Sequence, residues 1–595
     1  MLLLARTARA LRPTLARRLP RTRRAATTDP LYITTPIYYV NAAPHVGHAY
    51  TSVACDAAAR FARLDGRVAT LVTGTDEHGE KIEESAAMND CEPLEFATRV
   101  SGTFRDLADS FDIKYDRFIR TTDEDHKIAV EALWQKLEEN GQIYLGSYEG
   151  WYCVRDECFY TEGELVDGKA PTGAEVEWRA KEPSYFFKLS AWGDTLIDLY
   201  ETEDILGPKS RKNEVLSFLK MEELRDLSIS RTSFKWGLQV PNDPDHVVYV
   251  WVDALTNYLT AIGFPDGAWE ASWRGATHVV GKDILRFHAV YWPAMLLAAG
   301  LPPPKKIYAH GWWTKDGSKI SKSTGNVVVP SELIDEYGLD ATRFFLLSEI
   351  PFGADGDFSR TAMLASCNGF LANAVGNLCQ RCCAMIGKNL QGSSPALADL
   401  TPEDNALLDK AHALGDAMRP HMDQLAFNKA LAEVEAVVRD ANRYFDGMEP
   451  WKLKKTSPER MGVVLAVAQE TLRCVAICYQ PFMPRSATKM LDLLGVNEND
   501  RDLSNLRGAA VAAGTVLPPP SAVFPRVEDV GEVEAPAAPA APASKPAVDV
   551  AAVQVQIDAQ GATIRKLKDR GLGNKNPQVA GAVAELLRLK ALLED

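Results

Sequence analysis

The turn from a β-rich run into a long helix constrains this chain more than any other stretch of its sequence. Residues 31–35 read as a strand, and residues 49–64 continue as a helix-like segment; the motif His-Val-Gly-His stands between them. A helix start presents free backbone N–H groups and a positive dipole end, which together bind a polyphosphate. His45 and His48 can point to one side and donate to phosphoryl oxygens. Gly47 has no Cβ, so a flat base could lie against the backbone there.

A basic loop far downstream supports a nucleotide site. Lys319 and Lys322 are interleaved with Ile320 and Ser321, and Gly325 follows shortly after. A mobile cationic loop of this kind suits a departing pyrophosphate. Each motif alone also fits ordinary surface, either a helix start with two hydrogen-bonded histidines or a solvated basic loop. The ordered pair is much rarer than either motif.

The two motifs resemble the signatures of class I aminoacyl-tRNA synthetases, and the likeness to methionyl-tRNA synthetases runs from roughly residue 31 to residue 494. The resemblance implies an α/β fold, in which a Rossmann-type parallel sheet is split by an insertion and followed by an α-helical bundle that binds the anticodon. It implies that methionine is activated with ATP and Mg²⁺ to methionyl-adenylate and transferred to tRNA(Met). It assigns catalysis to His45, His48, Lys319 and Lys322, and ATP binding to Gly47, Gly281, Asp283 and Lys322.

The methionine pocket is expected along four stretches of the chain. The resemblance assigns it to Ile37, Tyr39, Asp76, Trp251, Ala254, Leu255, Tyr258, Ile284, His288 and Trp292. Asp76 follows a buried-strand pattern at residues 67–73 and could hold the substrate's ammonium group, although it could also cap the next helix. Residues 247–254 read as another buried strand. Sulfur gains about 0.3–1.5 kcal/mol per aromatic contact, so we expect aromatic walls and a polar group, Tyr39 or His288, beside it.

An insertion at residues 143–225 carries a pair of cysteines. Cys153 and Cys158 lack a second Cys or His pair, and residues 170–178 supply none, whereas tetrahedral zinc needs four ligands. We therefore expect no structural zinc and no other metal site. The insertion is expected to be held by its aromatic side chains, Trp151, Tyr160, Trp178 and Phe186.

The helical part of the chain carries an expected RNA site. Asn377 and Arg381 lie four residues apart, and Trp451 follows Pro450 downstream. Polar groups that read base edges, beside an aromatic ring on which a base stacks, suit single-stranded RNA. The resemblance matches these three positions to anticodon readers. A solvated helix face and a Trp that packs a helix end are the alternatives. Three nearby cysteines favour packing over metal binding: Cys379, Cys382 and Cys383.

We expect seven segments along the chain. A transit peptide is expected at 1–28. The catalytic domain follows in two halves, at 29–142 and 226–358, separated by the insertion at 143–225. A helical domain at 359–507, an Ala/Pro-rich linker at 508–550 and a helical hairpin at 551–595 complete the chain. The hairpin resembles a WHEP domain, which implies weak contact with tRNA or a protein partner through Arg565, Lys566, Lys568 and Lys575. Its alternative is a solvated helix face.

The first segment is basic and free of acidic residues. Residues 1–28 contain eight arginines and leucines at helical spacing, the pattern of an organellar transit peptide. We therefore expect a location in the mitochondrial matrix, with a plastid or dual targeting as alternatives; a basic RNA-binding arm is the other interpretation.

The composition of the chain limits the size of its core and the kinds of partner it can have. With 595 residues and 46% apolar side chains, the chain can bury a large core, and no run reaches the ~18 apolar residues of a membrane span, so we expect no membrane partner. Ten cysteines in this length do not indicate a disulfide scaffold. The net charge of −14 does not itself suggest RNA, although a local basic surface remains compatible with it. Other readings are another class I synthetase, a His-x-Gly-His nucleotidyltransferase, or a catalytically silent RNA-binding or assembly protein.

Overall fold

The computed structural model describes residues 30–154, 158–160, 162–171, 173–221, 223–315, 318–319 and 328–528, together with Lys566. The chain divides into two compact units, Met1–Val527 and Glu528–Asp595, and the elements described below belong to the first. Lys322, the segment at 1–28 and all of the expected hairpin except Lys566 lie outside the described residues.

A parallel sheet of seven strands forms the centre of the N-terminal half of the first unit. Its order is β2 (Tyr38–Tyr39), β3 (Ala69–Asp76), β1 (Leu31–Thr34), β13 (Ala276–Gly281), β14 (Lys306–His310) and β8 (Leu206–Gly207), with β4 (Arg117–Arg120) also paired to β3. In register, Tyr32 of β1 lies opposite Ala276 on one side and Thr70 on the other. The expected α/β class with a Rossmann-type parallel sheet is confirmed.

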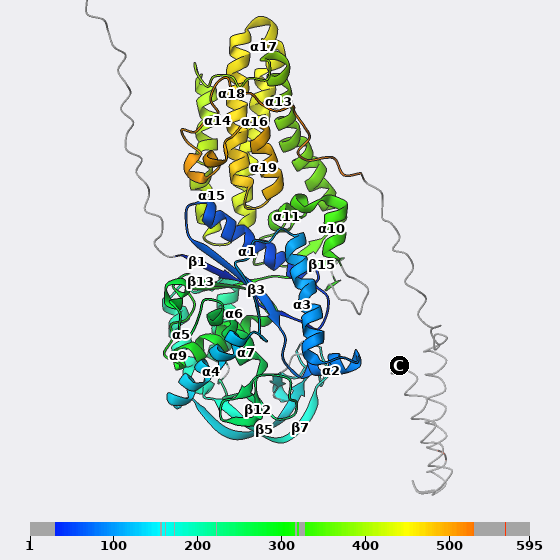
Figure 1. The fold of residues 1–595 in the computed structure, drawn as a ribbon, viewed down its shortest axis with the longest axis vertical. Coiled ribbons are helices and arrows are strands. Elements are labelled where there is room, and N and C mark those ends of the chain that lie inside the picture. The colour runs from blue at the N-terminus through cyan, green and yellow to red at the C-terminus, as the bar shows by residue number, and fades with distance from the viewer. Residues whose placement is uncertain are drawn as a thin grey trace, which may run out of the picture. The chain divides into compact units, whose positions relative to one another are not determined.

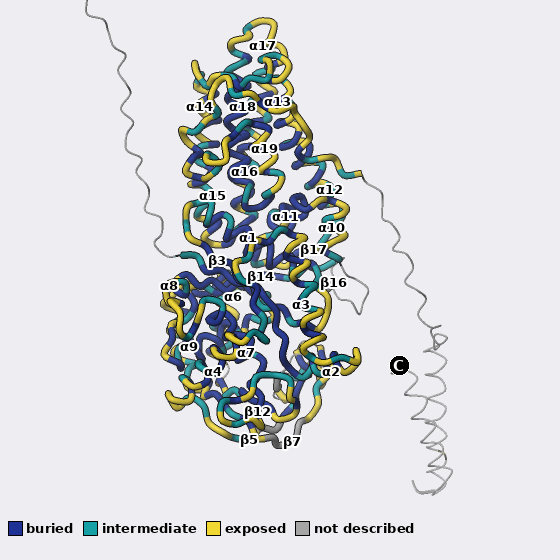
Figure 2. The backbone as a smooth tube through the Cα atoms, viewed as in Figure 1, coloured by how far each residue is buried: buried dark blue, intermediate teal, exposed yellow. Residues whose placement is uncertain are grey.

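Helix α1 (Val46–Leu64) leaves the sheet at its topological switch point. The chain passes from β1 through α1 to β3 on one side of β1, whereas β13 pairs with the other side. Ligands of open α/β sheets bind at the carboxyl ends of strands where the order reverses in this way. Figures 1 and 2 show α1 as a largely buried helix between the sheet and the helices of the bundle. The expected strand and helix around the first motif are thus both present.

The remaining helices of the catalytic half cover the sheet and its edges. They are α2 (Glu80–Met88), α3 (Pro93–Ser110), α4 (Glu124–Glu139), α5 (Gly193–Thr202), α6 (Lys209–Met221), α7 (Val250–Thr260), α8 (Trp269–Trp273) and α9 (Trp292–Ala298). A short sheet follows β14 and contains β16 (Ser318–Lys319), β15 (Trp313–Lys315) and β17 (Gly356–Phe358) in that order.

The insertion forms an antiparallel sheet of its own. Its strand order is β6 (Cys158–Tyr160), β5 (Ile143–Cys153), β7 (Glu177–Phe187) and β9 (Leu227–Ser228). The Trp151 and Trp178 rings meet edge to face with centroids 5.3 Å apart, but Trp178 is 55% exposed and so covers the insertion rather than filling its core. The chain rejoins the main sheet at β8, before residue 225, because β8 pairs with β14.

The expected strand at residues 247–254 is wrong over most of its length. Strand β12 (Asp243–Val248) ends early, in a small antiparallel sheet with β10 (Ser230–Arg231) and β11 (Gln239–Val240), and α7 begins at Val250. Helix α7 is buried almost all round, with Trp251 the partly exposed exception. A short helix of that kind has no polar face, so its apolar run cannot be distinguished from a buried strand by periodicity.

The second half of the unit is helical, as expected. Its helices are α10 (Pro330–Tyr337), α11 (Leu339–Ser348), α12 (Arg360–Leu364), a π-helical segment (Ala365–Gly376), α13 (Asn377–Asn389), α14 (Pro402–His412), α15 (Leu414–Met422), α16 (Phe427–Met448), α17 (Pro450–Thr456), α18 (Pro458–Tyr479) and α19 (Pro484–Leu493). Among the described residues, α18 alone is long and apolar enough to cross a membrane; 89% of its most apolar window is buried within the protein.

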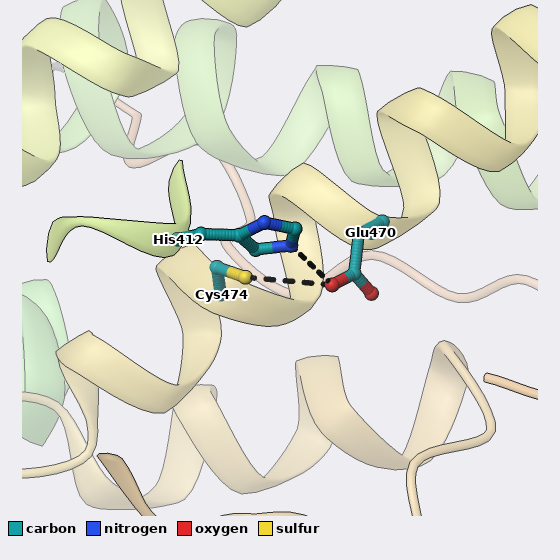
Figure 3. Close-up of side chains that lie close together, drawn as sticks. All are labelled: His412, Glu470 and Cys474. Atoms are coloured by element: carbon teal, nitrogen blue, oxygen red, sulfur yellow. Dashed lines mark hydrogen bonds and ion pairs between the residues drawn. The ribbon is translucent and has the colours of Figure 1, made fainter. Parts of the chain in front are cut away.

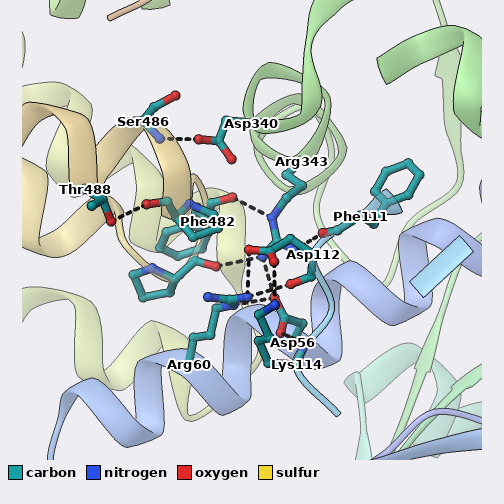
Figure 4. A network of polar contacts seen from close by, with 12 residues as sticks. Asp56, Arg60, Phe111, Asp112, Lys114, Asp340, Arg343, Phe482, Ser486 and Thr488 are labelled. Carbon is teal, nitrogen blue, oxygen red and sulfur yellow. Dashed lines mark hydrogen bonds and ion pairs between the residues drawn. The ribbon is translucent and has the colours of Figure 1, made fainter. Parts of the chain in front are cut away.

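A buried arginine joins the two halves (Figure 4). The Arg343 guanidinium, on α11, donates to Asp56 Oδ2 on α1 at 2.6 Å and to the Phe111 carbonyl at 2.9 Å. It also donates to the carbonyls of Pro481 and Phe482, both at 3.0 Å, in the turn after α18. Arg343 and Asp56 are each fully buried, and a buried charge is tolerated only when it is paired and hydrogen-bonded. The contact therefore fixes α1 relative to the helical half.

We expect the substitution Arg343→Met to lower the free energy of unfolding by about 3–5 kcal/mol, because three buried carbonyls lose their donor and the Asp56 carboxylate keeps only Arg60 as a charged partner. Urea unfolding followed by circular dichroism measures the change. Arg439→Met is the matched control, since that guanidinium is 66% exposed in its pair with Glu435, and it should cost less than ~1 kcal/mol. Equal losses in the two variants would contradict a structural role for Arg343.

Candidate functional site

Two histidines cap the first turn of α1. His45 is the N-cap residue: its Nδ1 accepts the Gly47 N–H at 3.1 Å, while His48 Nδ1 accepts the His45 N–H at 3.1 Å. The two rings stack with centroids 3.9 Å apart. An Nδ1 that accepts a hydrogen bond carries no proton, so each neutral ring has its proton on Nε2. Nε2 is therefore the atom through which each imidazole can donate to an oxyanion.

Gly47 is required by this cap. A Cβ at residue 47 would lie 2.9 Å from His45 Cε1 and 3.0 Å from His45 Nδ1, closer than carbon atoms approach without a shift. The sequence suggested that Gly47 makes room for a base. The structure gives a more direct reason for glycine, because any side chain at residue 47 would displace the His45 ring from the helix start.

Aromatic side chains hold the His48 ring in place. Phe104 meets it edge-on at 5.2 Å and Tyr38 at 4.8 Å between centroids. The Tyr38 hydroxyl lies 2.7 Å from Ser52 Oγ and donates to the His48 carbonyl at 3.2 Å. The ring orientation is thus set by packing from β2, α1 and α3.

The strand that precedes the second motif, the loop with Lys319 and Lys322, is hydrogen-bonded to α1. His310 ends β14, and its Nε2 lies 2.8 Å from the hydroxyl of Thr51, which itself lies 3.1 Å from the Gly47 carbonyl. Strand β15 follows, and Thr314 pairs with Lys319 of β16. The backbone of Lys319 is therefore placed within a short sheet that continues from β14, whereas Lys322 lies outside the described residues.

The two residues expected at the ATP ribose lie together at the end of β13. Gly281 ends the strand and Asp283 stands in the following 3₁₀ turn, Lys282–Ile284; a Cβ at Gly281 would lie 2.4 Å from Asp283 Oδ1. The Trp312 indole donates to that same oxygen at 2.9 Å. This turn follows β13, which is the neighbour of β1, the strand before β2 and α1 in the chain.

The structure brings most of the expected methionine-pocket residues into one core. Leu255, Tyr258 and Trp292 are buried in the same apolar cluster, and Ile37, Trp251 and Ile284 pack against it. Ala254 is buried beside them on α7. Tyr39 and Asp76 are register partners at the ends of β2 and β3, and Tyr39 packs against a separate small cluster with Val40 and Ile82.

Both ring nitrogens of His288 are hydrogen-bonded within the protein. Its Nδ1 lies 2.9 Å from the Ile284 carbonyl, and its Nε2 lies 2.7 Å from the Tyr258 hydroxyl. Burial lowers the pKa of His288 to about 4, so the ring is neutral at pH 7; Nδ1–H donates to the carbonyl and Nε2 accepts from Tyr258. His288 therefore fits a role in holding Tyr258 better than the sulfur contact expected from the sequence.

The sequence analysis missed a second buried imidazole beside this pocket. His278, on β13, lies 3.0 Å from Thr34 Oγ1 through Nδ1 and accepts the Trp292 indole N–H at Nε2 over 3.3 Å. Its ring stacks on Tyr258 at 4.0 Å, and burial lowers its pKa well below the usual range. A histidine inside an apolar strand was the signal, but its partners are distant in sequence.

A third missed group joins α7 to the end of β3. The carboxylate of Asp253 on α7 lies 2.6 Å from His78 Nδ1 and 2.7 Å from His126 Nε2. Asp253 is 1% exposed, and His78 comes two residues after Asp76. An acidic residue within the apolar run of α7 was the only sequence signal.

The expected anticodon readers are close in space at the helical end of the unit. The Arg381 guanidinium lies 5.3 Å from the Trp451 ring centroid and 4.9 Å from that of Phe445, and it is paired with Asp446 at 2.8 Å. Trp451 is 37% exposed, and Asn377 is exposed at the start of α13. An exposed ring beside a guanidinium is suited to base stacking.

Neither candidate for a metal site in the helical half fits a metal ion. Cys379, Cys382 and Cys383 are buried, and the last two thiols donate to the carbonyls of Leu465 and Leu493. These contacts agree with packing.

Within the described part of the chain, the other grouping is His412, Glu470 and Cys474 (Figure 3). Arg473 donates to both Glu470 oxygens at 2.7 Å, so a cation already occupies that carboxylate, and burial raises the pKa of the Cys474 thiol well above its usual value. A protonated thiol beside a guanidinium is a poor divalent-metal ligand.

Comparisons with known proteins identify the family. The model described as tRNA synthetases class I (M) matches residues 31–177 and 164–383, and that of the anticodon binding domain of methionyl tRNA ligase matches residues 394–536. The methionine–tRNA ligase of Rickettsia felis is 51% identical over 505 residues, which cover 84% of this chain and 98% of the relative. That of Brucella suis is 50% identical over 509 residues, with the same two coverages.

A solved structure agrees with these matches. Mycobacterium tuberculosis methionyl-tRNA synthetase in complex with methionyl-adenylate has a TM-score of 0.81 and 47% identity to this chain, and the alignment covers 84% of this chain and all of that one (100%).

The relatives also correct one expectation. They include methionine–tRNA ligases of Rickettsia, Brucella and Rhizobium, all bacterial. This finding contradicts the mitochondrial or plastid location expected from residues 1–28. Two family models that together span the catalytic and helical halves, and relatives about half identical over nearly their whole length, show that the chain belongs to the class I methionyl-tRNA synthetases.

Proposed function

We propose that the residues of the two motifs carry methionine activation in this chain: His45, His48, Lys319 and Lys322. As a methionine–tRNA ligase, it uses ATP to form methionyl-adenylate and passes the methionyl group to tRNA. The methionine carboxylate attacks the α-phosphorus of ATP, which enters as its magnesium complex, and pyrophosphate leaves with the bonding electron pair. No side chain has to act as a nucleophile, because positioning and electrostatic stabilisation supply the rate.

The orientation of the two imidazoles is the observation that carries this proposal. With both Nδ1 atoms bound to backbone N–H groups, Nε2–H is the donor of each ring at the positive end of α1. Fixed donors stabilise the charge that builds up on the phosphorus oxygens without reorganising during the reaction. Lys319 and Lys322 would face the leaving pyrophosphate, and Gly281 and Asp283 would bind the ribose.

The amino acid is proposed to bind between α7, α9 and the end of β3. Asp76 would pair with the ammonium group, as a nearly buried carboxylate at a strand end can. Trp251, Tyr258 and Trp292 would form aromatic walls around the thioether, whose sulfur is attracted to ring edges. Ile37, Tyr39, Ala254, Leu255, Ile284 and His288 would complete the pocket.

The helical half is proposed to read the anticodon. Asn377 and Arg381 would contact base edges, and Trp451 would stack a base. The order of domains expected from the sequence between residues 29 and 550, an insertion free of structural zinc, and a tRNA or protein contact through the segment at 551–595 remain part of this proposal. Exchange of pyrophosphate into ATP, measured with each amino acid in turn, tests the function: only methionine should support it well.

We expect His48→Asn to lower kcat of ATP–pyrophosphate exchange by about 10²–10³-fold, because Asn can retain the acceptor at the Nδ1 position but has no donor at the Nε2 position. The KM for methionine should change less than about twofold. His48→Gln offers a donor near the Nε2 position and should lose less activity. A variant that raises only the methionine KM would refute the assignment. His421→Asn, on α15, is the control that should leave exchange unchanged.

Trp451→Ala should raise the KM for tRNA by about 5- to 150-fold, the range given by one lost base stack of ~1–3 kcal/mol. Pyrophosphate exchange requires no tRNA and should not change. Trp451→Phe retains a stacking face and should recover much of the affinity. Aminoacylation kinetics with tRNA(Met) measure both variants; an unchanged KM in the alanine variant would exclude Trp451 from the anticodon site.

Deletion of residues 530–595 should raise the KM for tRNA severalfold by removing basic side chains that attract phosphates, and should leave pyrophosphate exchange intact. A full-length variant with Arg565, Lys566, Lys568 and Lys575 changed to Glu should show the same loss if charge is the cause. If neither protein differs from the parent in aminoacylation, this segment has no part in tRNA binding.

A further inference from the structure

We infer that His78, Asp253 and His126 form a buried clamp that positions the methionine pocket by holding α7 against the end of β3. The clamp rests on the pocket proposed above. Its three members are positioning residues, since they act through the helix that carries the pocket walls. The clamp is defined by the two hydrogen bonds to the Asp253 carboxylate.

The clamp uses both oxygens of one buried carboxylate. Asp253 Oδ2 lies 2.6 Å from His78 Nδ1, and Oδ1 lies 2.7 Å from His126 Nε2. Asp253 is 1% exposed, His126 is fully buried and His78 is 6% exposed. All three residues are buried, so their hydrogen bonds are stronger than exposed ones and costly to break.

The ionisation of Asp253 agrees with this geometry. Burial alone would raise the pKa of its carboxyl group, but the two adjacent imidazoles lower it to about 2. An ionised carboxylate only accepts hydrogen bonds, so both histidines donate to it: His78 through Nδ1–H and His126 through Nε2–H. Each ring therefore contributes one specific nitrogen, which makes the contribution testable by amide replacements.

Helix α7 is fixed at both of its ends. His126 Nδ1 also lies 3.0 Å from the hydroxyl of Thr260, the last residue of α7, and Arg117 donates to the Thr260 carbonyl at 3.4 Å. His126 thus bridges the first turn of α7 to its final residue. On the other side, His78 meets the Trp236 ring at 5.4 Å, and the Trp236 indole donates to the Glu77 carbonyl at 2.6 Å.

The clamp connects the two parts of the proposed pocket. Asp253 stands between Trp251 and Ala254 on α7, while His78 follows Asp76 by two residues at the end of β3. A shift of α7 would move the aromatic walls away from the carboxylate proposed for the ammonium group. Displacements of about 1 Å cost catalysis heavily when two parts of a substrate must be held together. ATP would be bound by other elements, so its binding should depend little on the clamp.

A neighbouring ion pair shows how the clamp differs from contacts that only stabilise the fold. Glu77, between Asp76 and His78, is fully buried and receives Arg120 Nε and Nη2 at 2.7 and 2.8 Å. That pair braces β3 against β4, which carries no proposed pocket residue. The Glu77–Arg120 pair does not include α7, whereas the bonds to Asp253 and Thr260 do. Loss of the clamp should therefore affect methionine in particular, whereas a loss of stability should affect every substrate.

The test compares variants that retain or remove one donor nitrogen. In His126→Gln the side-chain amide can replace Nε2–H, and in His78→Asn it can replace Nδ1–H; His126→Phe and His78→Leu remove the donors. Steady-state pyrophosphate exchange with the full chain gives KM for methionine and for ATP. The donor-free variants should raise the methionine KM about 10- to 100-fold, with the ATP KM within about twofold, and the amide variants should recover most of the loss.

A stability-matched control separates positioning from folding. Val434→Ala opens a cavity in α16, far along the chain from the pocket, and should lower the melting temperature without changing the methionine KM. Equal rises in both KM values, or amide variants no better than donor-free ones, would overturn the clamp. If a His126 variant does not fold, the His78 pair gives the same comparison. Failure of the unmodified chain to exchange with methionine would instead overturn the proposed function.

Discussion

The ion pair between Asp56 and Arg343 is the constraint on which the relation between the two halves depends. It lies on the helix that begins with the histidine cap, and its guanidinium also binds carbonyls in the turn after α18. Both charges are wholly buried, so the arrangement is stable only while every partner is in place. The helix that would bind the nucleotide is consequently held against the turn after α18, in the helical half that would bind RNA.

Histidine is used in two ways around the site. His45 and His48 are partly exposed and accept backbone N–H groups through Nδ1 in a helix cap, which leaves Nε2 as the donor nitrogen of each neutral ring. His278, His288 and the two clamp histidines are buried and bond to fixed partners. Burial lowers the pKa of His278 and His288, which keeps those rings neutral and lets one nitrogen accept while the other donates. The pocket walls are thus oriented by imidazoles that need never contact substrate.

Much of the fold could be predicted because its signals are local. The strand at 31–35, the helix after residue 45 and the helical second half follow from periodicity and helix-start chemistry. The strand expected at 247–254 failed because α7 is apolar on nearly every face. The polar networks could not be predicted, since they depend on pairs such as Thr34 with His278, separated by 244 positions, or His78 with Asp253, separated by 175. No local pattern records which distant side chain completes a buried hydrogen bond.

Helix α18 has a consequence for how the nascent chain is handled. Its length and hydropathy resemble those of a bilayer-spanning segment, yet in the finished protein it is surrounded by other helices. Before it packs against those helices, the same segment leaves the ribosome as an apolar stretch that an insertion machinery could engage. Glu470 and Arg473 lie within it, and charged groups near the middle of a segment disfavour insertion by ~2.5–3.5 kcal/mol each. The pair that is buried within the mature bundle thereby also makes α18 less favourable to insert into a membrane than its mean hydropathy alone would suggest.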